Sequence, residues 1–196
     1  MKINLNGNGQ EPVIKDQTLI LVSGGVESTS MLKKLLETTE WPITAVFLNV
    51  PNVWGKSIWE KNALDQLIPI LQKIRAFKYF EVKIDMPWAI VDAHIQVSLI
   101  PMLFEATGAV RMYRGLCSDD YAPGMTCWHD KFVAYAAQWQ GKPTEEITPD
   151  HPWLHITKRQ HMNYLGELAE LTFSCQLPVE GKPCGWCKSC LMRNKE

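Results

Sequence analysis

The sequence predicts an α/β fold, with helices on both faces of an open parallel sheet and a small cysteine-rich segment at the end of the chain. Residues 18–22 are continuously apolar, as a strand covered on both faces is, and residues 43–50 are predicted to form a second buried strand. A helical pattern lies between them, and strand, helix and strand within about 30 residues are typical of a βαβ unit. Alternating strands and helices continue downstream, which favours a single open sheet.

The first two helices are predicted from apolar residues at helical spacing. The first helix is expected to end before Trp41-Pro42. Its apolar face consists of Met31, Leu32, Leu35 and Leu36. A longer amphipathic helix is predicted over residues 57–75. Its apolar positions are Trp59, Ala63, Leu67, Leu71 and Ile74.

The later elements are shorter. Strands are predicted at 79–84, 110–116 and 153–156, and helices over 88–107, with an interruption at Pro101, and over 128–139. Thr157 and Gln160 have the spacing of a capping box, which predicts that a helix begins after Thr157. The loops at 51–56, 117–127 and 141–152 are rich in Pro, Gly and Asp and are where ligand contacts are expected.

Composition limits the functional classes. The chain has 196 residues, with 20 Lys and Arg against 21 Asp and Glu, so its formal net charge is −1. Such a balance argues against binding of bulk nucleic acid through charge alone. No apolar run reaches the roughly 18 residues of a membrane helix, and the N-terminus lacks a signal pattern. We therefore expect a cytoplasmic protein without membrane contacts.

A glycine-rich turn follows the first predicted strand and leads directly into a helix. It reads Ser23-Gly24-Gly25-Val26-Glu27-Ser28. In open α/β sheets ligands bind at the carboxyl ends of strands, and glycines with a helix N-terminus suit an anion such as phosphate. Neither a Walker A loop nor a dinucleotide fingerprint is present. A plain glycine-rich turn with a serine N-cap is the structural alternative.

Four of the six cysteines lie in the last 22 residues. Their spacing is Cys175-x8-Cys184-x2-Cys187-x2-Cys190. Four thiolates are the ligand set of a closed, structural zinc site, and Pro183 and Gly185 suit the turn between them. An iron–sulfur cluster and reduced cysteines without a metal remain open as alternatives.

The glycine-rich turn resembles the PP-loop of ATP pyrophosphatases, whose usual form is Ser-Gly-Gly-x-Asp-Ser. Ser23, Gly24, Gly25 and Ser28 match, whereas Glu27 stands where aspartate is usual. The resemblance implies binding of ATP with Mg²⁺. The residues that it implicates in nucleotide binding are Leu21, Val22, Ser23, Gly24, Gly25, Val26, Glu27, Ser28 and Thr29.

Together, the two motifs resemble those of the 7-cyano-7-deazaguanine synthase (preQ0 synthase) family. The stretches 171–175 and 184–193 are similar to the family's closing segment, and the region from Gly115 to Cys127 is similar to one of its loops. The resemblance implies a Rossmann-like fold of the adenine nucleotide alpha hydrolase type. It also implies an ATP-binding domain over 1–170 and a zinc-binding segment over 171–196.

That family adenylates 7-carboxy-7-deazaguanine with ATP, forms an amide with ammonia, and dehydrates the amide to the nitrile after a second activation. The resemblance implies catalytic roles for Ser23, Glu27, Ser28 and Lys158, and nucleotide contacts from Asp120 and Tyr121. It implies as partners the acid, ATP and ammonia, and it leaves a homodimer open. The product of such an enzyme serves tRNA or DNA modification.

Other interpretations stay open at this point. One is a related PP-loop enzyme that stops at the amide, joins the acid to a protein amine, or modifies tRNA. Another is a catalytically degraded relative that only binds a nucleotide, which the exchange at Glu27 favours. At the level of single residues, Lys158 is also consistent with an isolated surface lysine, Asp119 with a solvated loop acid, and Cys117 with an incidental thiol.

Overall fold

The computed structural model describes residues 17–51, 54–85, 92–119 and 152–194, together with Lys131 and Gln138. At its centre lies a four-stranded sheet in which every neighbouring pair is parallel. The order across the sheet is β3-β2-β1-β4. The strands are β1 (Gln17–Leu21), β2 (Ile43–Asn49), β3 (Lys78–Lys83) and β4 (Ala109–Arg114).

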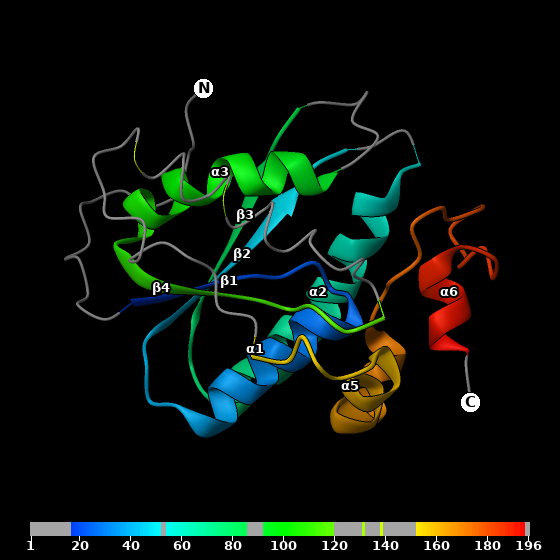
Figure 1. The fold of residues 1–196 in the computed structure, drawn as a ribbon, viewed down its shortest axis with the longest axis horizontal. Coiled ribbons are helices and arrows are strands. Elements are labelled where there is room, and N and C mark those ends of the chain that lie inside the picture. The colour runs from blue at the N-terminus through cyan, green and yellow to red at the C-terminus, as the bar shows by residue number, and fades with distance from the viewer. Residues whose placement is uncertain are drawn as a thin grey trace.

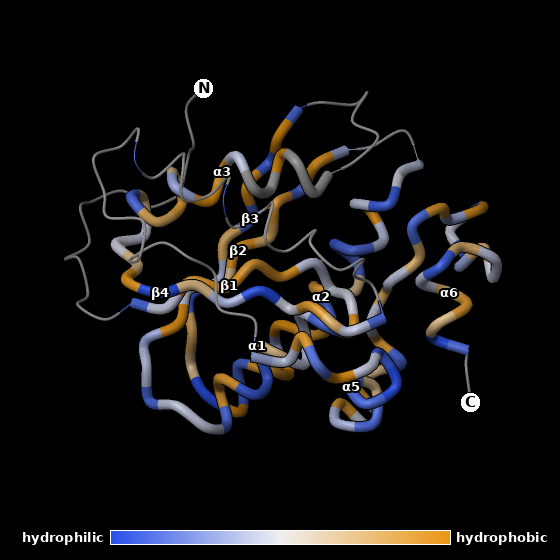
Figure 2. Tube along the Cα trace, in the orientation of Figure 1, coloured by the Kyte–Doolittle hydropathy of each residue, from blue (hydrophilic) through white to orange (hydrophobic). Residues whose placement is uncertain are grey.

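Helices cover both faces of the sheet, as predicted (Figure 1). Helices α1 (Val26–Thr38) and α2 (Lys56–Ile74) pack on one face, and α3 (Asp92–Thr107) packs on the other. Figure 2 shows hydrophobic residues concentrated along the central strands, while hydrophilic residues alternate with hydrophobic ones along the outer helices. The central strands β1 and β2 are thus buried on both sides, which explains their mainly apolar sequences, whereas β3 and β4 at the edges are partly exposed.

The face predicted for α1 is confirmed, since Met31, Leu32, Leu35 and Leu36 are all buried in the core against β1, β2 and α2. In α2 the inward positions are confirmed for Ala63, Leu67 and Leu71. Ile74, however, is 41% exposed, because the helix ends at this residue and no longer follows the sheet.

Two predicted elements are wrong. Pro101 does not interrupt the helix, which runs through it to Thr107. A proline inside a helix costs about 3 kcal/mol, and burial of Leu99, Ile100, Leu103 and Phe104 against the sheet offsets that cost. Residues 153–156 form a turn rather than a strand, in which the Ile156 N–H donates to the Trp153 carbonyl. Of the helix predicted over 128–139, the structure describes only Lys131 and Gln138, and both are helical.

The C-terminal part begins with α5 (Lys158–Leu165), followed by the 3-10 helix η2 (Gly166–Leu171) and, after the first cysteines, α6 (Lys188–Arg193). Both bonds of the predicted capping box are present between Thr157 and Gln160. Helix α5 packs against α1, where the Ser30 hydroxyl lies 2.5 Å from Nδ1 of the buried His161. In the described part of the chain, no helix has the length and hydrophobicity needed to cross a membrane.

Candidate functional site

The carboxyl ends of β1 and β4 mark the point where the order of the sheet reverses. From β1 the chain continues through α1 to β2 on one side, whereas β4 pairs with β1 on the other side after the chain has passed through α3. Ligands of open α/β sheets bind in the crevice at such a switch point. Residues 23–28, which we call the 23–28 loop, follow β1 at this point, and residues 115–119 follow β4.

The two serines of the 23–28 loop hold it closed upon itself. The Ser28 hydroxyl accepts the Ser23 N–H at 3.1 Å and lies 3.2 Å from the Ser23 hydroxyl. The N-cap residue of α1 is Gly25, which has no side chain to cap the helix. The serine N-cap of the structural alternative is therefore wrong, whereas the glycine-rich turn itself is present. The first turn of a 13-residue helix faces this loop, and its N–H groups have the polarity that binds anions.

Close backbone packing explains two of the glycines. A Cβ atom on Gly24 would lie 2.8 Å from the Glu60 carbonyl oxygen in α2, and φ at Gly24 is +70°. A Cβ atom on Gly115 would lie 2.3 Å from the Ser28 nitrogen. The backbone after β4 thus lies directly against the first turn of α1, and no side chain fits between them.

A buried ion pair connects the loop to the start of α5. Nζ of Lys158 is 2.8 Å from Oε1 of Glu27, and the lysine side chain is 1% exposed. The thiol of Cys117, also buried, donates to the same carboxylate oxygen at 3.7 Å. The alternative of Lys158 as an isolated surface lysine is therefore wrong. The longer side chain at position 27 reaches a fixed cation.

Residues 118 and 119 tie the end of β4 to the start of α5. The Ser118 N–H donates to the Ile156 carbonyl at 2.9 Å, and Oδ2 of Asp119 accepts the backbone N–H of Lys158 at 2.7 Å. Asp119 is thus bound to the N-terminus of α5 rather than merely solvated. These bonds fix the base of the Lys158 side chain.

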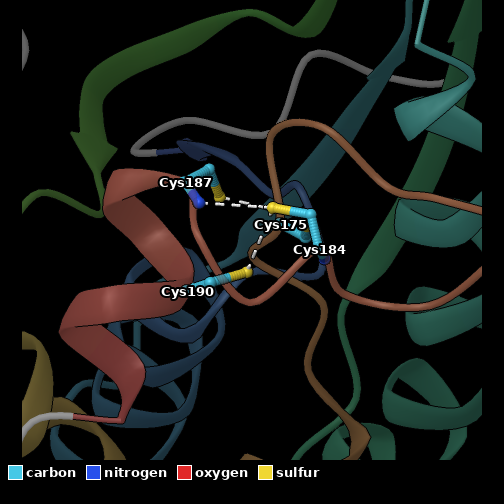
Figure 3. Close-up of side chains that lie close together, drawn as sticks. All are labelled: Cys175, Cys184, Cys187 and Cys190. Carbon is cyan, nitrogen blue, oxygen red and sulfur yellow. Dashed lines mark hydrogen bonds between the residues drawn. The ribbon is translucent and has the colours of Figure 1, made fainter.

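The four C-terminal cysteines converge on one point (Figure 3). Their sulfur atoms all lie within 4.8 Å of one another, and Sγ of Cys187 is 4.0 Å from Sγ of Cys175. The Cys184 N–H donates to the Cys175 sulfur at 3.3 Å, and the Cys187 N–H donates to the Cys184 sulfur at 3.2 Å. Such donors stabilise thiolates, which are the form that binds a metal.

The acidities of these cysteines differ within the cluster. Burial raises the pKa of Cys190 to about 12 and also raises that of Cys175. Burial also acts to raise the pKa of Cys187, but backbone N–H donors from Gln176 and Cys190 outweigh it and bring that pKa to about 6. Four thiolates in one buried cluster need a cation, so the donor set fits a metal ion.

The family is decided by comparison with protein-family models. The model described as "Queuosine biosynthesis protein QueC" matches residues 56–196, which is most of the chain. The chain belongs to the QueC family. The matched region contains Gly115, Lys158 and all four clustered cysteines, and the 23–28 loop precedes it.

Individual relatives of this QueC-family chain are 7-cyano-7-deazaguanine synthases. The chain is 45% identical over 103 residues to the synthase of Leptospira biflexa serovar Patoc, and this alignment covers 47% of this chain and 42% of the relative. It is 33% identical over 110 residues to the synthase of Rhizorhabdus wittichii, and this alignment covers 52% of this chain and 48% of the relative. The aligned part of the chain spans about half the length of the curated relatives it matches.

A solved structure with the same fold is the U34-tRNA thiolase NcsA from Methanococcus maripaludis, determined with its 4Fe-4S cluster. The TM-score is 0.56 at 12% identity, and the match covers 91% of this chain and 64% of the thiolase. At this identity the likeness shows the fold alone. It confirms the Rossmann-like PP-loop architecture predicted for the QueC-family chain.

The structure describes some of the predicted site residues but not all of them. Val22 and Val26 are buried in the core, so only their backbone faces the loop. Asp120 and Tyr121 lie outside the described residues, as does Cys127. Two contacts were not predicted, namely the Ser174 hydroxyl beside Val26 and the Arg193 guanidinium beside Thr172. The resemblance of 171–175 to the family's closing segment was the signal that pointed to this region.

Proposed function

We propose that this chain is an ATP-dependent ligase that converts 7-carboxy-7-deazaguanine and ammonia to 7-cyano-7-deazaguanine. The observation that carries the proposal is the 23–28 loop at the switch point of the sheet, where the N-terminus of α1 lies next to a buried Glu27–Lys158 pair. Membership of the QueC family and the activity of the relatives support the choice of substrate.

A carboxylate must be activated before ammonia can displace one of its oxygens. A carboxylate is a poor electrophile, and its oxygen attacks the α-phosphorus of ATP, so that pyrophosphate leaves and an acyl adenylate forms. Ammonia then attacks the acyl carbon, AMP leaves with the C–O electron pair, and loss of a proton gives the amide. A second adenylation, on the amide oxygen, makes that oxygen part of a leaving AMP, and loss of protons from nitrogen gives the nitrile.

Residues of this chain would stabilise the negative charge that develops on pyrophosphate. The helix-start N–H groups and the hydroxyls of Ser23 and Ser28 donate to phosphate oxygens, and the Lys158 ammonium supplies positive charge in a site of low dielectric. Bound Mg²⁺ would supply further charge neutralisation to the phosphates. Glu27, which is itself a residue of the loop, holds Lys158 in place through its carboxylate.

A cleft at the same edge of the sheet offers room for the organic part of a ligand. It has a volume of about 500 Å³ and lies beyond the carboxyl ends of β2 and β3. Its polar lining consists of Asn49, Ser57, Lys83 and Asp85. Asn49 is also bound through its amide to Glu81, 2.7 Å away, which fixes its orientation.

For the cysteine cluster we propose a single structural zinc ion. A tetrahedral site with Zn–S bonds of about 2.3 Å has sulfur atoms about 3.8 Å apart. The 4.0 Å separations of Cys175 from Cys187 and of Cys184 from Cys190 are close to that value. A cubane iron–sulfur cluster places each thiolate on a different iron and needs a wider spread.

The test is mass spectrometry of a reaction that contains the purified chain, ATP, Mg²⁺, ammonium and 7-carboxy-7-deazaguanine. We expect the nitrile together with AMP, and Lys158→Met should abolish both. Lys73→Met, which changes an exposed lysine at the end of α2, is the matched control and should retain activity. A folded, metal-loaded sample that forms no AMP would overturn the proposal. Accumulation of the amide alone would assign the chain to the amide-forming variant.

A further inference from the structure

Residues 172–175, which we call the 172–175 segment, contact both the 23–28 loop and the cysteine cluster. The Phe173 N–H donates to the Gly24 carbonyl at 2.9 Å, and the Ser174 hydroxyl accepts the Val26 N–H at 3.4 Å. The next residue is Cys175, whose sulfur belongs to the cluster and is buried. One or two peptide units therefore separate the loop contacts from a metal ligand.

The other end of the 172–175 segment is bound by α6, the helix that carries Cys190. The Arg193 guanidinium donates to the Thr172 hydroxyl at 2.8 Å, to its carbonyl at 3.2 Å and to the Ala169 carbonyl at 2.5 Å. Thr172 is itself buried. The cysteine region thus fixes the segment at both ends, while the middle of the segment holds the loop.

The 172–175 segment is a main connection between the cysteine region and the 23–28 loop. A cleft of about 540 Å³ lies between α2 and the cysteine region, and residues 171–175 form part of its wall. Trp59 of α2 lies against Phe173, with ring centroids 6.3 Å apart, and also against the backbone of Gly181. Displacement of the cysteine region would therefore move Phe173 and with it the Gly24 carbonyl.

We infer that Ser174 is a positioning residue of the 23–28 loop and that metal binding at the cysteine cluster sets the conformation of this loop through the 172–175 segment. The inference rests on the proposed function, because it assigns a purpose to the loop geometry. Val26 is the first helical residue of α1, which has no side-chain cap of its own, so the Ser174 hydroxyl acts as a cap from 148 residues away.

The experiment is hydrogen–deuterium exchange of the whole chain, read on peptides that cover residues 22–31. Removal of the metal with a chelator should speed exchange of these amides by about two- to tenfold, the effect of losing one ordinary hydrogen bond. A peptide that covers β3 should not change. Unchanged exchange at 22–31 in the metal-free chain would overturn the inference.

Variants separate the two links of the coupling. Ser174→Ala and Arg193→Met should each speed exchange at 22–31 while the metal content of the chain, measured by atomic emission, stays the same. Ser174→Thr restores the hydroxyl and should return exchange toward the wild-type rate. Ser98→Ala, on the opposite face of the sheet, is the matched control. Wild-type exchange in both test variants would count against the inference.

A second readout keeps this test apart from the proposed function. Calorimetric titration of wild-type chain with ATP and Mg²⁺ tests the nucleotide site itself, and no binding would contradict the proposed function alone. If ATP binds, Ser174→Ala should raise its dissociation constant and the KM for ATP by about two- to tenfold and leave kcat nearly unchanged. A loss in kcat without a change in KM would contradict a positioning role.

Discussion

Glu27 and Lys158 form a buried ion pair in which each charge depends on the other. The carboxylate and the ammonium group lie 2.8 Å apart, and the lysine side chain is almost completely removed from water. Charges that leave water in this way are expensive unless they are close together, and removing one partner is worse than removing both. The pair is therefore sensitive to asymmetric substitution.

We predict that Lys158→Met destabilises the chain by about 3–5 kcal/mol, because the buried Glu27 carboxylate loses its ammonium partner. The double variant Glu27→Gln, Lys158→Met should recover a large part of that loss. Urea unfolding followed by circular dichroism measures the free energy of unfolding of each variant. Equal stability of the single and double variants would show that the pair is not coupled.

Gly115 is a second position where substitution should be costly, because an added Cβ atom would overlap the backbone of the 23–28 loop. Its Cβ position lies 2.3 Å from the Ser28 nitrogen and 2.4 Å from the Glu27 carbonyl carbon, both in the backbone. We predict that Gly115→Ala lowers the free energy of unfolding by about 3 kcal/mol or more and weakens nucleotide binding, because the loop must move.

The control for this prediction is Gly166→Ala at the end of α5. Nothing lies within 4 Å of its Cβ position, but φ is +58°. With φ of +58° and ψ of −130°, this residue lies outside the left-handed helical region, so the change should cost about 1–3 kcal/mol through backbone strain and leave nucleotide binding intact. Unfolding curves and calorimetric titrations compare the two. If Gly115→Ala proves the milder change, the close packing described for the loop is wrong.

At this scale the sequence predicted residue identities better than residue environments. Ser23, Ser28 and the four cysteines could be singled out because their spacing itself indicates the chemistry, and the structure brings the four cysteines together. The burial of Lys158 was not predicted, since it depends on contacts with Glu27, 131 positions away in the chain, and with Asp119. Spacing along the sequence contains no information about such a pair.

The carboxylate of Glu37 lies at the edge of the contact between α1 and α5 and is bound from both helices. The Tyr164 hydroxyl donates to the Glu37 carboxylate, and Lys33 pairs with the same carboxylate at 2.7 Å and lies over the Tyr164 ring. Partial burial acts to raise the pKa of Glu37, but the bonds from Lys33 and Tyr164 outweigh it and hold this pKa below its ordinary value of 4.5.

A carboxyl group with a lowered pKa in the folded state stabilises that state above its unfolded pKa. The stabilisation is lost as the pH falls through the folded value. We predict that Glu37→Gln removes part of the acid sensitivity of unfolding below about pH 4.5, by less than about 1 kcal/mol because the group is partly exposed. Thermal unfolding between pH 3 and pH 7 measures it, with the exposed Glu40→Gln as control. A steeper acid dependence in Glu37→Gln would have the wrong sign.

Elements were predictable where their pattern depended on burial by the sheet. Strands β1 and β2 and the apolar face of α1 follow from runs and periods of apolar residues. The mistaken strand at 153–156 is a short apolar stretch too, but Trp153 packs on His161 and Tyr164 of α5 instead of pairing with a strand. A stretch of four residues does not distinguish these outcomes.

For the whole molecule, the arrangement brings four distant segments to one edge of the sheet. The 23–28 loop, residues 115–119, the start of α5 and the 172–175 segment meet there through the contacts of Gly115, Lys158 and Phe173. The parallel order β3-β2-β1-β4 accounts for the first two, because the ends of adjacent parallel strands meet. The other two depend on the C-terminal part folding back, which strand patterns alone did not predict.

The metal content of the whole chain tests the last of these connections. The sulfur separations favour one tetrahedral ion, so we predict about one zinc per chain and no acid-labile sulfide. Cys184→Ser should lower the zinc content and the melting temperature, since binding of a structural metal stabilises only the folded state. Cys117→Ser, a buried thiol outside the cluster, should keep its zinc. Atomic emission and sulfide analysis decide between the metals: iron with sulfide in proportion would replace zinc by a cluster and require the four thiolates to move apart.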